Sequence, residues 1–279
     1  QIDASELSPR GSVELHGIKT FSGQRIDESI LQAAAIMCMV GGPLASTFDQ
    51  IIQGKGDILP RVEALDYEDE MGIVAWVGGV RVLLGNRRLL EEHGIAPPSL
   101  DYEKKYLTGQ RQATYLASGG DLVAMFVVTY HPDAAVMEEL QRLEDNGVSL
   151  LVSTYDSNIT ATMISNHYKL AFRSVKVLPY AESRLFEDLK AEKEERTRAY
   201  AATRGKAPVM HRVIAACVRF KGNSSLSLVW QVTSVVFSIL LVGLLTIFGG
   251  LTQIGTLEIL LYVLFWSAAV LIVPFLRKP

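Results

Sequence analysis

The stretch LSLVWQVTSVVFSILLVGLLTIFGGLTQIGTLEILLYVLFWSAAVLIVPFL, residues 226–276, decides how the C-terminal part of this chain is built. Its only charged side chain is Glu258. A helix needs about 20 mostly apolar residues to cross the hydrocarbon core of a bilayer, and residues 226–249 and 257–276 each provide them. A buried core helix of a large soluble protein has a similar composition, but two adjacent, uninterrupted runs favour the membrane. The sequence therefore predicts a transmembrane hairpin.

Basic residues flank this hairpin and predict its orientation. Arg219 and Lys221 precede the first run, Arg277 and Lys278 follow the second, and the turn between the runs has neither lysine nor arginine. Loops rich in lysine and arginine stay on the cytoplasmic side. We therefore expect an integral membrane protein, in the plasma membrane, with residues 1–221 in the cytosol and the lipid bilayer as its first partner.

Composition excludes several classes of function. The net charge is −3, so no basic field attracts nucleic acid, and we expect no nucleic-acid partner. The two cysteines, Cys38 and Cys217, form neither a disulfide framework nor a C-x-x-C motif, which suits a reducing compartment. The histidines lack ligand spacing, and Glu258 lies near the start of the second span, where it can reach the interface. We expect no metal site.

Helix and strand patterns alternate between residues 132 and 178. Residues 132–146 have helical spacing and residues 149–153 form an apolar run. A second helix is predicted at residues 158–167, and a second strand at residues 171–178. This alternation argues for a parallel sheet with crossover helices.

The preceding region follows another pattern. Residues 73–77 and 80–84 flank Gly78-Gly79, which is a hairpin turn signal, and residues 114–117 and 122–129 form a second hairpin. Two helices precede these strands, a short helix follows the first hairpin at residues 86–93, and residues 1–20 look irregular. We interpret residues 21–129 as an antiparallel lobe inserted into the parallel one.

The fold class is thus α/β plus membrane helices. Residues 1–20 and 130–205 are assigned to the parallel-sheet domain, and residues 21–129 to the inserted α+β domain. Residues 206–221 are predicted to form a juxtamembrane amphipathic helix, and residues 222–279 the hairpin. The charged stretch 182–198 reads as a solvated helix.

Three motifs, in this order, carry a family resemblance. GGVRVLLGN at residues 78–86 looks like a strand ending in Gly-Asn, and PDA at residues 132–134 looks like the start of an Arg-Pro-Asp-Ala helix. TYDSNITA at residues 154–161 looks like T-G-D-N-x-x-T-A. Together they resemble the C-terminal half of a P-type ATPase, most closely the heavy-metal-transporting branch. The resemblance implies a haloacid-dehalogenase-like phosphorylation domain with an inserted nucleotide-binding domain, ion transport, and ATP and Mg²⁺ as cofactors.

The resemblance also assigns site residues. In the phosphorylation domain Asp3 falls at the aspartate that accepts the phosphoryl group, and Thr154 and Asp156 fall in the T-G-D motif. In the nucleotide-binding domain the matching positions are Gly42, where the family has a histidine that contacts ATP, together with Gly72, Gly85 and Asn86.

The chain departs from the family at the charges that phosphoryl transfer needs. Ala4 stands where the lysine after the nucleophile belongs, and Glu6 adds negative charge nearby. Tyr155 replaces a glycine that allows close approach of phosphate. Glu182 replaces a phosphate-contacting lysine, and the G-D-G-x-N-D loop that holds Mg²⁺ has no counterpart.

Two main hypotheses follow. The first is a catalytically degenerate pseudoenzyme with a regulatory or binding role, acting beside a membrane protein partner. The alternative is a divergent ATP-driven cation transporter that acts through an aspartyl-phosphate at Asp3. The chain opens with Gln1 rather than Met, and we expect an N-terminal membrane half upstream. A phosphatase-like hydrolase, the third idea, needs the same missing Mg²⁺ loop.

Overall fold

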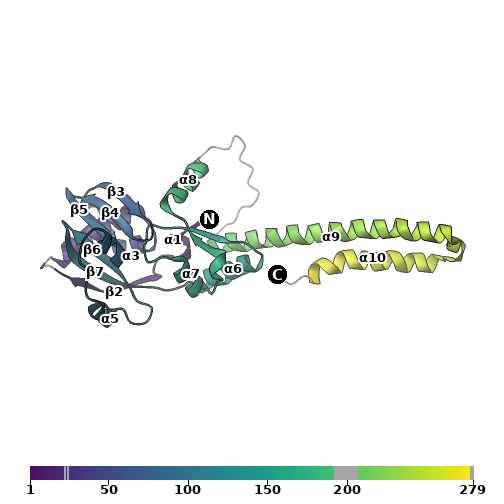
Figure 1. Cartoon of the computed structure of the whole chain (residues 1–279), viewed down its shortest axis with the longest axis horizontal. Helices are drawn as coiled ribbons and strands as arrows, with labels where there is room; N and C mark the ends of the chain where they lie inside the picture. Colours follow the sequence, from purple (N-terminus) through teal and green to yellow (C-terminus); the bar gives the residue numbers. More distant parts are fainter. Residues whose placement is uncertain (22, 24, 192–206, 277–279) are drawn as a thin grey trace.

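The computed structural model describes residues 1–21, 23, 25–191 and 207–276. Figure 1 shows two lobes side by side at one end of the molecule and a long helical hairpin extending away from them. The lobes are formed by the first 191 residues, and the hairpin is formed by the last two helices.

The antiparallel lobe is a six-stranded sheet with the order β2-β7-β6-β5-β4-β3. Its strands are β2 (Val13–Thr20), β3 (Val62–Glu68), β4 (Gly72–Val77), β5 (Val80–Gly85), β6 (Gln112–Ser118) and β7 (Asp121–Tyr130). Four helices accompany it: α2 (Ile26–Val40), α3 (Pro43–Ile51), α4 (Arg87–Glu92) and α5 (Leu100–Tyr106).

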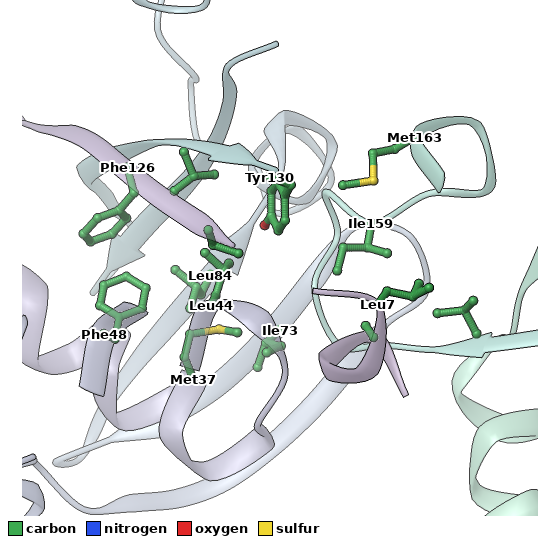
Figure 2. Close-up of a cluster of buried hydrophobic side chains, with 14 of the residues drawn as sticks. Leu7, Met37, Leu44, Phe48, Ile73, Leu84, Phe126, Tyr130, Ile159 and Met163 are labelled. Carbon is green, nitrogen blue, oxygen red and sulfur yellow. The ribbon is translucent and has the colours of Figure 1, made fainter. Parts of the chain in front are cut away.

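Each face of this sheet packs against its own helices. Along β5, Val82 and Leu84 belong to the core that α2 and α3 cover, whereas Leu83 belongs to the core beneath α4 and α5. Successive side chains of a strand point to opposite faces, so this alternation separates the two cores. On the first face Phe48 meets Phe126 edge to face, with 5.2 Å between ring centroids (Figure 2).

The parallel lobe confirms the alternation predicted for residues 132–178. Its sheet has the order β1-β8-β9, formed by β1 (Ile2–Asp3), β8 (Leu150–Ser153) and β9 (Val175–Val177), and both pairings are parallel. Its helices are α1 (Ala4–Leu7), α6 (Ala134–Asp145), α7 (Ala161–Tyr168) and α8 (Tyr180–Ala191). The predicted strand at 171–178 is shorter, because a 3₁₀ turn, η2 (Phe172–Ser174), precedes β9.

The interpretation of residues 1–20 as irregular and as part of the parallel domain was wrong for β2. This strand pairs along its whole length with β7, so it belongs to the antiparallel sheet. Its register shifts between Leu15 and Gly17, and Val13 is its one buried residue. A bulged edge strand loses the regular apolar alternation that marks a strand in sequence.

The last two helices match the predicted hairpin. Helix α9 (Ala207–Ile247) and helix α10 (Thr256–Leu276) are joined by η3 (Gly250–Gln253). Both are long and apolar enough to cross a membrane, by length and composition, and their most apolar windows are 0% buried, which does not fit a soluble core helix. The predicted juxtamembrane helix and the first span form one continuous helix, whose first turns pack on α6 with His211 and Ala215 buried. The part of the predicted charged helix beyond Ala191 lies outside the described residues.

Candidate functional site

The candidate site lies where parallel strands β1 and β8 end. Asp3 is the last residue of β1 and pairs in register with Ser153, and Thr154 follows directly. Ligands of open α/β sheets bind at the carboxyl ends of the strands. The structure therefore brings Asp3, Thr154 and Asp156, which lie far apart in sequence, to one edge of the sheet.

The carboxylate of Asp3 is exposed and engaged by its own neighbours. Asp3 is the N-cap of α1, and its Oδ1 accepts hydrogen bonds from the Ser5 backbone N (2.8 Å) and the Ser5 hydroxyl (2.6 Å). Ala4, which stands in the position of the family lysine, is buried. An N-cap carboxylate satisfies otherwise unpaired amide groups of the first helical turn, so Asp3 has a local structural role.

Asp156 is only 4% exposed, and both of its oxygens are occupied. The Tyr130 hydroxyl donates to Oδ2, and the Asn158 backbone N donates to Oδ1 over 3.0 Å. Burial raises the pKa of Asp156 to about 6, against the hydrogen bonds from Tyr130 and Asn158, which lower it. Among the residues that the structure describes, no basic side chain pairs with this carboxylate.

Thr154 completes the turn and does not face an open site. Its hydroxyl, in a residue 9% exposed, accepts a hydrogen bond from the Asp156 backbone N over 3.0 Å. Such a bond, from a backbone N to a threonine hydroxyl two residues earlier, fixes a local turn.

Tyr155 fills the position of the family glycine with an aromatic ring. Its ring lies 5.4 Å from that of Tyr67 and 6.0 Å from that of Tyr180, between centroids. Tyr67 belongs to β3 of the other lobe, so the rings lie between the lobes. Sequence reasoning identified Tyr155 but missed Tyr67, Tyr130 and Tyr180, because each looks like an ordinary core aromatic until the lobes are folded together.

Three of the four predicted nucleotide residues lie together at the joint between β4, β5 and α4. Gly72 and Gly85 are register partners. A Cβ on Gly85 would lie 2.2 Å from the Met71 carbonyl oxygen, and one on Gly72 would lie 2.5 Å from the Cα of Gly85. Asn86 caps α4, and its Nδ2 donates to the Glu70 carbonyl over 2.6 Å. Close packing of backbones accounts for both glycines.

Gly42 lies elsewhere, at the start of α3. It has a φ of +89° and lines a hollow of about 370 Å³. Other residues of that hollow include Ser5, Arg10, Cys38, Ser46 and Asp49. The structure therefore does not place Gly42 with Gly72, Gly85 and Asn86.

A second hollow, of about 490 Å³, lies between the lobes. The antiparallel lobe contributes Tyr67, Asp69, Glu70 and Arg88 to its lining. The parallel lobe contributes, among others, Ser157, Thr160, Lys176 and Pro179. Its charges are mixed, since two carboxylates face two cations. Across the described residues no group of three or more His, Cys, Asp or Glu side chains has a metal-binding arrangement.

Comparisons with known proteins complete these observations. No model of a protein family matches the chain. A copper-exporting P-type ATPase of Legionella pneumophila is 28% identical over 165 residues, which is 59% of this chain and 22% of that protein. A silver exporting P-type ATPase of Salmonella typhimurium is 24% identical over 194 residues, 68% of this chain and 23% of that protein. The chain resembles heavy-metal P-type ATPases. It spans between a fifth and a quarter of the length of these relatives.

Solved structures of P-type ATPases also resemble the chain. The N-domain of a copper-transporting P-type ATPase has a TM-score of 0.34 at 17% identity, and the match covers 42% of this chain and 99% of that domain. A zinc-transporting PIB-type ATPase has a TM-score of 0.35 at 18% identity, and the match covers 67% of this chain and 30% of that one.

Proposed function

We propose that this chain is a P-type-ATPase-like membrane protein that does not transfer phosphoryl groups and acts by binding, as a regulator or scaffold. The observation that carries the proposal is the state of Asp156. Its carboxylate is buried, it accepts hydrogen bonds from Tyr130 and Asn158, and it has no cation beside it among the described residues. Phosphoryl transfer needs charges that are free to meet phosphate and metal.

The residues at this edge do not fit Mg²⁺ and a nucleotide phosphate. Mg²⁺ takes oxygen ligands in a nearly ideal octahedron. Both carboxylate oxygens of Asp156 instead accept hydrogen bonds from Tyr130 and Asn158. Lysine is absent beside Asp3, where Ala4 and Glu6 stand. The carboxylate of Glu182 faces Lys176 at 2.9 Å, so this pair adds no net positive charge to the edge.

A second candidate is the divergent cation transporter that forms an aspartyl-phosphate at Asp3. Asp3 is exposed at the end of β1, next to the end of β8, which supports this alternative. The similarity to a copper-exporting and a silver exporting P-type ATPase supports it further.

The experiment that separates the two uses the whole chain in detergent or nanodiscs. The chain is incubated with γ-labelled ATP and Mg²⁺, and acid-stable, hydroxylamine-sensitive label is counted, with Asp3→Asn as the control. Calorimetry with ATP, with and without Mg²⁺, accompanies it. We expect no label and no Mg²⁺-dependent gain in affinity. Label that disappears in Asp3→Asn would overturn the proposal and establish the transporter chemistry.

We also propose where the protein works. Residues 1–221 would lie in the cytosol and the hairpin would lie in the plasma membrane, since basic residues stand at both ends of the hairpin and none in its turn. A membrane protein, or a membrane segment of the same protein, would be the binding partner. Protease protection in vesicles of known orientation tests this. Cleavage of residues 1–221 by a protease confined to the side opposite the cytosol would contradict the proposed orientation.

A further inference from the structure

Three tyrosines from the two lobes meet in one cluster. Tyr67 comes from β3 of the antiparallel lobe, Tyr155 follows β8, and Tyr180 begins α8. All three ring pairs lie within 6.2 Å between centroids. Beside them Asp69 Oδ1 accepts a hydrogen bond from the Tyr180 backbone N over 2.7 Å. Aromatic pairs at such distances attract each other beyond the area they bury, so the cluster holds the lobes together.

A second set of contacts joins the lobes through Asp156 and Asn158 of the 154–158 turn. Tyr130, at the end of β7, donates to Asp156, and the amide of Asn158 donates to the Thr114 hydroxyl of β6 over 2.7 Å. Tyr130 and Thr114 are 1% and 4% exposed, so separation of the lobes would leave buried polar groups without partners.

The hydrophobic core also continues from one lobe to the other. One cluster of buried residues contains Phe48 and Phe126 of the antiparallel lobe and Leu7 and Ile159 of the parallel lobe. Figure 2 shows Tyr130 between these two groups. In the described part of the chain two covalent connections, residues 8–12 and 131–133, link the lobes, and the His131 backbone N donates to the Ser12 carbonyl over 2.7 Å. Without the other contacts, such a double connection would serve as a hinge.

We propose that the Tyr67–Tyr155–Tyr180 cluster is a latch that holds the two lobes closed over Asp156. The lobes then move as one body, and they separate at Asp156 only when the rings part together with the Tyr130–Asp156 and Asn158–Thr114 hydrogen bonds. This inference goes beyond the proposed function, because it concerns motion and not chemistry.

The chain carries its own reporters for this motion. Its two cysteines are Cys38 on α2 of the antiparallel lobe and Cys217 on α9, which packs on the parallel lobe, and both are exposed. Spin labels on these two residues of the whole chain in nanodiscs report the separation of the lobes by pulsed electron resonance. We expect one narrow distance distribution that millimolar Mg²⁺-ATP does not shift.

Tyr155→Gly and Tyr67→Ala should each add a second, longer distance component. The matched control is Tyr106→Ala, which removes a ring from an aromatic cluster inside the antiparallel lobe, where Tyr106 lies 5.1 Å from Tyr102. The control should keep the narrow distribution. If Tyr155→Gly fails to fold, as judged by circular dichroism, Tyr180→Ala takes its place.

The outcomes are separable from those of the phosphorylation assay. A broad distribution in the unmodified chain, or variants as narrow as Tyr106→Ala, would overturn the latch whether or not a phosphoenzyme forms. A phosphoenzyme in a chain with one narrow, nucleotide-insensitive distance would overturn the proposed function and leave the latch standing.

Discussion

Two buried carboxylates of the parallel lobe are held in opposite ways. Glu139, on α6, is 1% exposed, and its Oε1 accepts from the Arg212 guanidinium over 2.8 Å from Nε and 2.5 Å from Nη2. Asp156 is 4% exposed and accepts from a hydroxyl and a backbone amide. One carboxylate has a cation as its partner, and the other has only neutral donors.

This difference in partners distinguishes a contact between two helices, at Glu139, from the candidate site at Asp156. Arg212 belongs to the helix that continues into the first predicted span, so the Glu139 pair joins the parallel lobe to the α9–α10 hairpin. Asp156 lies at the sheet edge where ligands of such folds bind. There the carboxylate accepts hydrogen bonds from the Tyr130 hydroxyl and the Asn158 backbone amide. The Glu139–Arg212 pair fixes the position of α9 on α6. At Asp156, burial of the charged carboxylate without a cation lowers the stability of the fold.

Removing the cation from Glu139 should have the largest effect. Arg212→Leu removes both hydrogen bonds that the guanidinium donates to Glu139 Oε1 and leaves this buried carboxylate only the longer contact with Arg142, and breaking the pairing of a buried charge is strongly destabilising. The whole chain in detergent should unfold at lower denaturant concentration, and the α6 amides should exchange faster. The double variant Arg212→Leu/Glu139→Leu should regain most of the lost stability, because it no longer buries a carboxylate.

The control for this change is Arg142→Leu. Arg142 is 3.7 Å from Glu139 Oε2 but bonds mainly to the exposed Glu138 over 3.0 Å. Its removal should change stability far less than removal of Arg212. Equal losses from both arginines would show that the α9 junction does not depend on the Glu139–Arg212 pair.

Asp156→Asn should stabilise the chain, opposite in sign to the Arg212 change. The pKa of Asp156 is about 6 in the folded state, above its ordinary 3.8, so the folded protein binds this proton more tightly. Stability from this group is then fully present below about pH 4 and lost as pH rises through 6, by about 3 kcal/mol. Asp156→Asn should be more stable at pH 8 than the unmodified chain, and its stability should depend less on pH. Denaturant titrations at pH 4.5 and 8 test this, and a destabilised variant at pH 8 would contradict it.

Local patterns in the sequence were enough to predict several elements. The hairpin follows from hydropathy within two short windows, and the parallel lobe follows from a change in period after residue 131. Both signals reside in neighbouring residues. Helix α5 was missed because its seven residues make too short a periodic pattern, although Ser99 caps it. Strand β2 was missed because its bulge interrupts the alternation.

The environment of the site could be predicted only in part. The resemblance assigned Asp3 and Asp156 to motifs of one domain, and the parallel register of β1 and β8 brings them to one edge of the sheet. The partners of Asp156 were not predicted, because Tyr130, 26 residues away in sequence, reaches it only through the packing of the two lobes. Gly72 and Gly85 were interpreted as nucleotide residues, yet their register pairing explains the glycines by packing alone. Nothing in a single sequence separates those two causes.

Tyr130→Phe removes one of the two neutral hydrogen-bond donors to the Asp156 carboxylate. A hydrogen bond to a charged group contributes about 2 kcal/mol, so the variant should lose about that much at pH 8 and less at pH 4.5, where Asp156 is protonated. The pH midpoint attributed to Asp156 should rise above 6. Chemical shift titration of a labelled Asp156 carboxyl measures that midpoint directly.

The matched control is Tyr115→Phe in the antiparallel lobe. Tyr115 donates to the buried carboxylate of Glu103, which also accepts from Arg87 over 2.7 Å. Because that carboxylate keeps its cation, Tyr115→Phe should change the pH dependence of stability less than Tyr130→Phe does. A similar change in the pH dependence of stability for both phenylalanine variants would contradict the prediction. It would show that a carboxylate paired with a cation and one paired with neutral donors respond alike.

The smallest effect, Thr114→Val, tests whether the groups around Asp156 act as one network. The variant loses the acceptor of the Asn158 amide and should cost about 1 kcal/mol. Because the Asn158 backbone also donates to Asp156, Thr114→Val and Asp156→Asn should be non-additive, with a coupling free energy of about 0.5 kcal/mol or more. Thr47→Val removes a hydroxyl that donates to the Val13 carbonyl inside the antiparallel lobe, so its effect should simply add to that of Asp156→Asn. If the free-energy changes of both threonine variants are additive with that of Asp156→Asn, the contacts around Asp156 act independently. The contrast with Glu139 is then only the presence or absence of one cation.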